Sequence, residues 1–241
     1  MRRTAVALAA ALAVILACIA WYYGLTPLPP TTPPPSTQPP TQPPPTQPAQ
    51  PTQPQQPQQP PAGQPVEVAE INGLGDLAAL VSTVEHEERV EGVNGTLYSR
   101  VRIARLGVVD GALRVEVVVE QEWSFEGFGP GNYSDCFVLR LKGNEPFMVE
   151  WPELGLNSTD PDIVGNYSVI AYQAWSPYSV EPIGNYSGVK ETPLGPVDVY
   201  KAEAEGYKGE VWVHRGVGIP VYYCMEGGGY RAEFKVITLE T

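Results

Sequence analysis

The sequence contains few of the residues that carry most enzyme chemistry. Its 241 residues include only two histidines and three cysteines. It also contains no Gly-x-Ser-x-Gly, no His-Glu-x-x-His and no phosphate-binding glycine loop, which are the patterns of common nucleophile, zinc and nucleotide sites. Its 27 acidic residues are too numerous for any one carboxylate pair to stand out. We therefore expect a protein that is not an enzyme and that needs no cofactor.

Positive charge is also scarce. There are 15 Lys and Arg residues against 27 Asp and Glu residues, and the net charge is -12. A chain of this charge repels a phosphate backbone, so binding to nucleic acid through overall charge is excluded. Three cysteines are too few for a fold held together by disulfides in a chain of this length.

The two histidines give weak signals. His86 lies in the sequence Glu85-His86-Glu87-Glu88, which would bind a divalent cation only weakly, so a solvated helix end is the favoured interpretation. His214 is expected on a strand beside Arg215, where it faces solvent. We expect no metal site.

Composition divides the chain into three segments. Residues 1–24 are apolar after Arg2 and Arg3, and residues 25–65 are rich in Pro, Gln and Thr and have no charged side chain. Residues 66–241 hold all the acidic residues and 13 of the 15 basic ones. Only this third segment can bury a sizeable core. We expect one domain, preceded by a signal segment and a linker.

The first segment is interpreted as a membrane signal. Residues 5–23 contain no charge and no proline, and at about 1.5 Å of rise per residue they span roughly 28 Å, close to the hydrocarbon thickness of a bilayer. The aromatic run 21–23 suits the membrane interface and favours an uncleaved anchor over a cleaved signal peptide. A third interpretation makes Cys18 a lipidated cysteine. All three place the domain outside the cytoplasm, either at the cell membrane or, after cleavage, secreted.

The second segment has low complexity. Residues 26–65 contain 18 of the 27 prolines and ten glutamines. They hold too few apolar side chains to form a core, so the segment is expected to be disordered. Proline favours extended geometry, and at about 3.1 Å per residue the segment reaches roughly 120 Å. It is interpreted as a stalk.

The third segment is expected to be mainly β, within the α+β class. Leu74, Leu77, Ala78, Val81 and Val84 recur at helical spacing and predict one helix. From residue 95 onward, apolar residues alternate with polar ones and turn signals separate the runs. The expected strands cover residues 96–106, 112–122, 135–142, 147–151, 167–175, 197–203, 210–215, 219–225 and 230–239. About nine antiparallel strands and one leading helix predict a curved meander or half-barrel packed on that helix.

This order of elements resembles the LolA/LolB and LppX-type lipoprotein carrier superfamily. Residues 209–221 carry the likeness, because a strand with Trp212 turns back through Gly218-Ile219-Pro220 and continues with apolar residues, as in the late hairpin of that superfamily. The resemblance implies a half-barrel whose concave face is plugged by helix, and the carriage of a lipid. It supplies no catalytic residues. The helices that fill the half-barrel in that superfamily are not evident here after residue 90.

N-glycosylation is the strongest chemical signal. Residues 66–241 contain seven asparagines, of which five begin an Asn-x-Ser/Thr sequon, although Ser and Thr make up only 15 of these 176 residues. Three sequons lie in the same tetrapeptide, Gly-Asn-Tyr-Ser, which suits an exposed turn. The alternative is a repeated turn sequence that carries no sugar. The predicted acceptors are Asn94, Asn132, Asn157, Asn166 and Asn185.

Two further sets of residues are candidates for local roles. Cys136 and Cys224 are the only cysteines of the third segment, and an oxidising location predicts a disulfide between them, with two buried free thiols as the alternative. The middle of the segment is rich in aromatic residues that would stack on a sugar or a lipid, although packing in the core is their commoner use. These aromatic residues are Trp151, Tyr172, Trp175 and Tyr178.

Two functional interpretations remain. In the first, a membrane-tethered, non-catalytic β domain on a stalk contacts proteins of the cell envelope or a surface layer, or another ligand such as a glycan. The alternative is a LolA-like carrier or binder of lipid or another apolar ligand. The inner face of the sheet separates them, because a carrier leaves apolar surface unfilled whereas a structural domain fills it with its own side chains.

Overall fold

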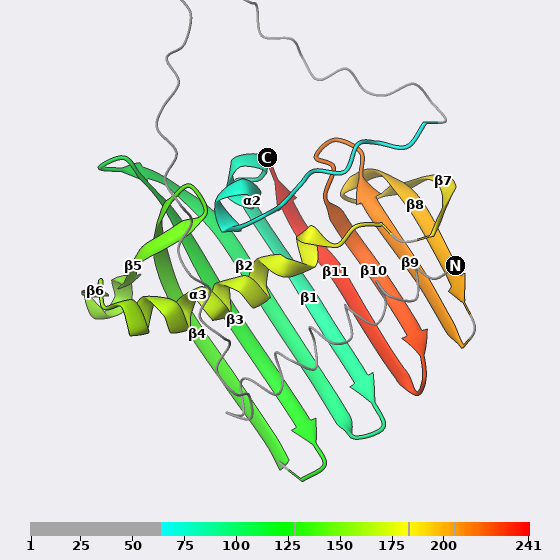
Figure 1. Ribbon diagram of the computed structural model, residues 1–241, viewed down its shortest axis with the longest axis horizontal. Coiled ribbons are helices and arrows are strands. Elements are labelled where there is room, and N and C mark those ends of the chain that lie inside the picture. Colours follow the sequence, from blue (N-terminus) through cyan, green and yellow to red (C-terminus); the bar gives the residue numbers. More distant parts are fainter. Residues whose placement is uncertain (1–63, 128, 183, 205) are drawn as a thin grey trace, which may run out of the picture. The chain divides into compact units, whose positions relative to one another are not determined.

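The computed structural model describes residues 64–127, 129–182, 184–204 and 206–241. The expected anchor, nearly all of the stalk and Cys18 lie outside this range. The strands form one 11-stranded antiparallel sheet in the order β6-β5-β4-β3-β2-β1-β11-β10-β9-β8-β7. Figure 1 shows that this sheet is open. The sequence predicted an antiparallel, mainly β domain correctly, but with about nine strands. None of the described helices is long and apolar enough to cross a membrane.

The elements have the following bounds. The strands are β1 (Thr83–Gly92), β2 (Gly95–Val109), β3 (Ala112–Phe125), β4 (Gly129–Lys142), β5 (Glu145–Trp151), β6 (Leu156–Ser158), β7 (Asn185–Thr192), β8 (Gly195–Ala204), β9 (Tyr207–His214), β10 (Pro220–Gly227) and β11 (Tyr230–Glu240). The helices are α2 (Leu74–Leu80), the 3-10 turn η1 (Pro152–Leu154), α3 (Pro161–Trp175) and the 3-10 turn η2 (Ser176–Ser179).

The sheet consists of two meanders that meet in its centre. Strands β1 to β6 run outward to one edge, and β7 to β11 return from the opposite edge until β11 pairs with β1. The chain therefore crosses the whole sheet between β6 and β7. Helix α3 and η2 make this crossing over one face of the sheet, at mid-height in Figure 1. We call this face the helix-covered face and the opposite one the outward face.

Helix α3 replaces a predicted strand. The expectation of a strand over residues 167–175 was wrong. The Asp160 side chain caps the helix by accepting a hydrogen bond from the backbone N–H of Asp162 at 2.9 Å, and Pro161 occupies the first turn. The residues that α3 buries are Val164, Ala171 and Ala174. A short apolar run is compatible with both the helical period of 3.6 residues and the strand period of 2. Here the N-cap sequence Asp160-Pro161 was the signal that indicated a helix.

The first helix is shorter than expected. It ends at Leu80, Val81 is its extended C-cap residue, and Val84 belongs to β1, the strand between β2 and β11. Val81 and Val84 fit helical spacing, but residues 81–84 form the sequence Val-Ser-Thr-Val, and β-branched residues favour a strand. His86 is consequently on a central strand rather than at a solvated helix end.

Alternation along the strands separates the two faces. On β3, Val115, Val117 and Val119 lie buried on the helix-covered face. The residues between them face outward, where Glu116 pairs with Arg102 at 2.9 Å. The single core therefore lies between the sheet and the layer formed by α2, α3 and residues 66–71.

The repeated tetrapeptide adopts three different conformations. Residues 131–134 lie within β4, residues 165–168 lie inside α3, and residues 184–187 enter β7. The prediction of a repeated turn was therefore wrong. The shared feature is the tyrosine, since Tyr133, Tyr167 and Tyr186 are all half-buried whereas the asparagine before each is exposed. Tertiary surroundings override a local preference as weak as that of a Gly-Asn pair.

Candidate functional site

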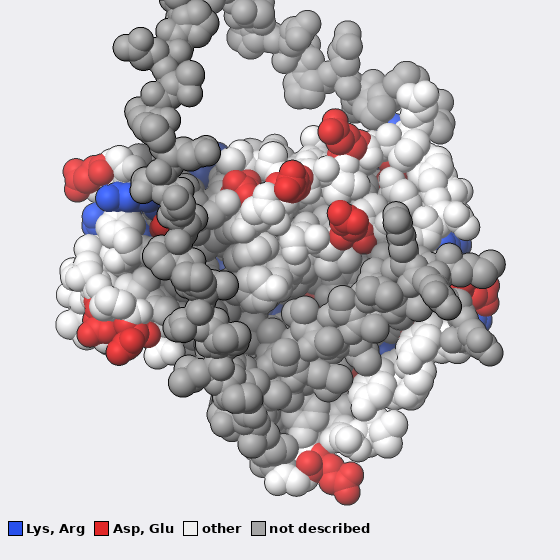
Figure 2. Space-filling view, in the orientation of Figure 1, with Lys and Arg blue, Asp and Glu red and all other residues white. Residues whose placement is uncertain are grey.

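The helix-covered face continues beyond α3. Among the described elements, no helix lies over the lower ends of the strands in Figure 1. We call this area the distal face. Where described atoms are visible in Figure 2, the lower part of the molecule is largely uncharged, with acidic side chains at its bottom tip. The distal face is the candidate site.

An uncharged row of residues crosses the distal face. The register pairs Met225 with Ala232, Ala232 with Val90, Val90 with Leu97, and Leu97 with Trp123. Trp123 lies four residues after the buried Val119 on β3, so the row lies on the helix-covered face. The complete row, over eight strands from β8 to β4, is Ala202, Gly209, Met225, Ala232, Val90, Leu97, Trp123 and Gly131. It holds apolar side chains and small residues, without one charge.

Aromatic rings lie over glycines at the lower ends of the strands. Trp123 is paired with Gly131, and its indole lies 2.5 Å from the position that a Cβ atom of Gly131 would occupy. Tyr230 lies at the same distance from the corresponding position of Gly92. Two further pairs repeat the arrangement, namely Tyr207 with Gly227 and Phe125 with Gly95. Each ring fills the space of a missing side chain, which produces a low aromatic surface.

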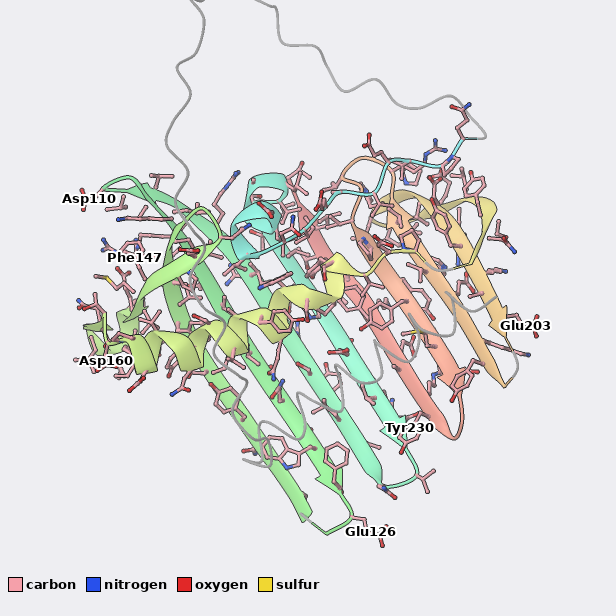
Figure 3. The ribbon with its side chains drawn as sticks, in the orientation of Figure 1. Asp110, Glu126, Phe147, Asp160, Glu203 and Tyr230 are labelled. Carbon is pink, nitrogen blue, oxygen red and sulfur yellow. The ribbon has the colours of Figure 1, made fainter. Side chains whose placement is uncertain are left out.

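The rings on this surface are accessible. Tyr207 is 39% exposed and Tyr230 is 42% exposed. Figure 3 shows Tyr230 at the lower end of the sheet, away from α3. Large apolar side chains under α3, in contrast, are fully enclosed. The distal face therefore presents flat apolar area that the described helices leave free.

The next row, which we call the polar row, separates the distal face from the covered core and holds polar side chains on either side of the buried Phe234. Tyr223 donates a hydrogen bond to the Glu88 carboxylate at 3.0 Å. Burial raises the pKa of Glu88 above its ordinary value, and the hydrogen bond from Tyr223 counteracts this in part. Ser99 is paired with Glu88 across β1 and β2 and is buried. A carboxyl group that resists ionisation thus lies at the inner border of the apolar surface.

A second polar group lies beside α3. Asp135 accepts hydrogen bonds from the hydroxyls of Tyr133 and Tyr167, both at 3.0 Å. The indole N–H of Trp151 donates to the Tyr167 hydroxyl at 3.2 Å. Burial raises the pKa of Tyr167, and the nearby Asp135 carboxylate raises it further. This network links α3 to β4 and β5.

The histidines differ from their predicted surroundings. His86 is only 1% exposed, and its Nδ1 lies 2.7 Å from the Tyr178 hydroxyl. Burial lowers the pKa of His86 to about 3, so the ring is neutral at physiological pH. His214 is half-buried, with Nε2 2.9 Å from the carbonyl oxygen of Leu194, rather than simply facing solvent. Within the described ranges, no three His, Cys, Asp or Glu side chains form a group suited to a metal ion.

The predicted stacking aromatics have separate surroundings. Tyr178 is fully buried, and Trp151 packs edge-on against Tyr167. Tyr172 is 40% exposed on α3 and contacts Trp175 edge-on. Stacking on a ligand remains a prediction for that second pair. The four rings of the distal face were not predicted, because the glycines at the strand ends look like turn residues in the sequence.

The predicted disulfide is absent. Cys136 and Cys224 are free thiols on β4 and β10. Five strand spacings of about 4.8 Å separate these strands, roughly 24 Å in total, whereas a disulfide joins Cα atoms less than about 7 Å apart. The prediction of an intramolecular disulfide was therefore wrong. The sequence does not reveal that the two meanders place these strands on opposite halves of the sheet.

The five predicted sugar acceptors are all exposed. They lie in the β1–β2 turn (Asn94), in β4 (Asn132), in β6 (Asn157), in α3 (Asn166) and at the start of β7 (Asn185). Only the first of them lies in a turn. Glycosylation at these positions stays a prediction.

One further hollow lies near the distal end, with a volume of about 620 Å³. Arg89, Tyr98, Glu122 and Asn132 line it, and the register joins them in one row across β1 to β4. They alternate with the residues of the distal face, so this row belongs to the outward face. Leu97, Trp123 and Gly131 of the uncharged row are also among the lining residues, but Arg89 and Glu122 place charges in the hollow, which does not suit an apolar ligand.

Comparison with known proteins identifies no family. No family model matches the chain, and no curated protein matches its sequence. A solved structure of MucB in complex with MucA(peri) is 15% identical, with a TM-score of 0.34 over 68% of this chain and 52% of that one. A putative outer membrane lipoprotein-sorting protein domain from Vibrio parahaemolyticus is 11% identical, with a TM-score of 0.19 over 70% of this chain and 91% of that one. This chain thus spans about half of the MucB chain. The likeness is partial at these TM-scores, so function rests on the residues of this chain.

Proposed function

We propose that this protein is a non-catalytic, extracytoplasmic binding protein that holds the hydrocarbon part of a lipid on its distal face. The observation that carries this proposal is the uncharged row of eight residues with aromatic rings below it, outside the area covered by α2 and α3. Burial of apolar surface stabilises such a complex by about 25 cal/mol per Å² before the cost of association. A hydrocarbon chain needs no hydrogen bonds, and the side chains of this row are apolar or absent apart from the indole N–H of Trp123.

The polar row gives the ligand a direction. Glu88 and Ser99 lie at the inner border of the apolar surface, next to the Tyr223 hydroxyl. Burial raises the pKa of Glu88, so this carboxyl holds a proton more readily than an exposed glutamate does, and a protonated carboxyl can donate a hydrogen bond. The polar head of an amphiphile fits this border, and its chain fits the distal face.

Tethering at the membrane forms part of the same proposal. Residues 5–23 would act as the anchor and residues 25–65 as the stalk, with the domain outside the cytoplasm. A tethered lipid binder samples the membrane surface within reach of its stalk. The first interpretation of the sequence, contact with proteins of the cell envelope, has the same tether and stays as the competing outcome of the test below.

Native mass spectrometry of the full-length chain, extracted from its own membranes, tests the proposal. We expect a reproducible adduct with the mass of a lipid. Leu97→Glu places a charge in the uncharged row and should remove the adduct. Val108→Glu is the matched control, since Val108 lies on the same strand but is exposed at its other end, and it should keep the adduct.

Three outcomes decide between the interpretations. Loss of the adduct in the first variant alone supports binding at the distal face. An adduct retained in both variants identifies lipid held by another part of the chain and contradicts the proposal. A chain without any adduct favours the role in envelope contacts. Ala232→Trp adds bulk without charge in the same row and should also remove the lipid, which controls for unfolding by a buried charge.

A further inference from the structure

The seven asparagines of the domain fall into two structural classes. Asn144 accepts a hydrogen bond from the Asp76 backbone N–H at 3.0 Å and donates one to the Asp76 carboxylate at 2.8 Å. Asn72 donates a side-chain hydrogen bond to Glu70 at 3.2 Å. These are the two asparagines outside sequons. Among the described residues, the side chains of the five sequon asparagines are exposed and make no hydrogen bond within the fold.

The sequon asparagines therefore have no visible structural role. A polar side chain that stabilises a fold makes hydrogen bonds to other residues of that fold, as Asn72 and Asn144 do. An acceptor of N-linked sugar needs the opposite, an amide that projects freely into solvent. The division follows the sequons without exception, and nothing in the sequon pattern itself required it. Exposure and the absence of partners thus support modification independently of the motif.

The sequons also occupy both edges of the sheet. An open sheet has two edge strands, here β6 and β7, and each presents unpaired backbone groups on its free side. Asn157 is the central residue of the three-residue strand β6, and Asn185 is the first residue of β7. Such edges pair with other chains unless charge, proline, a bulge or a cover prevents it.

Charge protects only half of β7. Lys190 and Glu191 lie in its second half, whereas its first five residues, 185–189, carry no charge. The sequon lies in this uncharged half, where a bulge between Tyr186 and Gly188 interrupts the pairing of β7 with β8. At the other edge, the neighbours of Asn157 in β6 are Leu156 and Ser158, also uncharged. A sugar at each asparagine would cover the part of each edge that charge leaves open.

We infer that N-linked oligosaccharides at Asn157 and Asn185 block association between sheet edges, as members of a set of five sugars that also includes Asn94, Asn132 and Asn166. The donor is an oligosaccharide on a lipid diphosphate. The bond between its anomeric carbon and the diphosphate oxygen breaks, and a bond from that carbon to the asparagine Nδ2 forms. The amide loses a proton, and the lipid diphosphate leaves. None of the five lies on the distal face, so this inference does not depend on the proposed lipid.

Glycopeptide mass spectrometry of the full-length chain from its own cells tests the modification. We expect sugar on the peptides of Asn157 and Asn185 in particular, and unmodified peptides for Asn72 and Asn144. Unmodified masses for the Asn157 and Asn185 peptides would overturn the inference at once.

Light scattering coupled to size-exclusion chromatography tests the role at the edges. The double variant Thr159→Ala and Ser187→Ala removes both sequons and leaves both asparagines in place. Thr159 and Ser187 are exposed, so the fold should persist. We expect at least a doubling of mass. The matched variant Thr96→Ala and Ser134→Ala, which removes the sequons of Asn94 and Asn132, should stay monomeric. Equal masses for the two double variants would refute the edge role even if all five sites carry sugar.

Discussion

The two halves of the helix-covered face use the same strands in different ways. Under α3, the face is built of enclosed side chains such as Val117 and Phe137, both at 0% exposure. On the distal face, glycines alternate across the strands with rings such as Trp123 that lie over them. The difference shows that bulky side chains fill the space between the sheet and a helix that covers it. Where no described helix covers the sheet, rings such as Trp123 lie flat over glycines of the neighbouring strand.

The largest contrast should appear when a phenylalanine is truncated in each half. Phe137→Ala removes a ring that is fully enclosed and packs against Tyr167, and it should cost about 3–5 kcal/mol of unfolding free energy. Phe125→Ala on the half-exposed distal end should cost about 1 kcal/mol, since less area is buried. Urea unfolding followed by circular dichroism measures both. Equal losses would show that the distal face is as tightly packed as the core.

Acid should weaken the covered half through His86. Its pKa is lowered to about 3 in the folded protein, whereas the unfolded value is near 6.5. Between these values the unfolded chain binds a proton that the folded protein does not, so stability falls as pH decreases from about 6.5 to 3. The fully developed loss is on the order of 5 kcal/mol.

Unfolding midpoints measured across this pH range test that dependence. The Gln side chain of the His86→Gln variant does not titrate. The slope of unfolding free energy against pH should therefore decrease by the equivalent of about one bound proton. A slope that is unchanged in the variant would show that other groups cause the acid sensitivity.

The border between the halves should respond to pH in the opposite sense. Burial raises the pKa of Glu88, so the folded protein holds a proton that the unfolded chain has lost once the pH exceeds the ordinary glutamate value. Stability from this group therefore falls as pH rises through that window. Glu88→Gln keeps an acceptor for Tyr223 and should raise the unfolding midpoint at pH 7 but not at pH 4. An equal rise at both pH values would rule out ionisation as the cause.

The smallest effect on stability is expected on the distal face itself. Gly131→Ala would place a methyl group 2.5 Å from the Trp123 indole, so the ring must lift off the strand. The stability change should stay within about 1 kcal/mol, because the ring is half-exposed and Ala is the better strand residue. Tryptophan fluorescence should shift toward longer wavelength as the ring enters water. Gly165→Ala, on α3 with open space around it and no positive φ, should leave the spectrum unchanged.

Much of the sheet could be predicted from local signals. Alternation in residues 112–122 and the turn at Asp110-Gly111 predicted β3 and its hairpin. The two faces of a strand are visible as alternating apolar and polar residues in its own sequence, and both turn residues adopt positive φ. Helix α3 was missed because the spacing of its apolar residues is compatible with both a helix and a strand. The burial of His86 was missed because the chain neighbours of His86 are acidic, while Tyr178, 92 residues away, supplies its hydrogen bond.

The candidate site was beyond local prediction for the same reason. Each glycine of the distal face looks like a turn residue until the register places a ring opposite it, and Trp123 reaches Gly131 only through the pairing of β3 with β4. The aromatic residues singled out in the middle of the sequence were instead divided between the core and the surface of α3.

The sequence by itself determined the composition of the segments, the antiparallel strands with their turns, and the positions of the five sequons, because charge, alternation and motifs are properties of neighbouring residues. Only the tertiary structure decided that the strands form one open sheet, that Cys136 and Cys224 lie too far apart to bond, and that two sequons fall on its edges. These outcomes depend on strand order, which arises from contacts between residues distant in the chain and has no local signature.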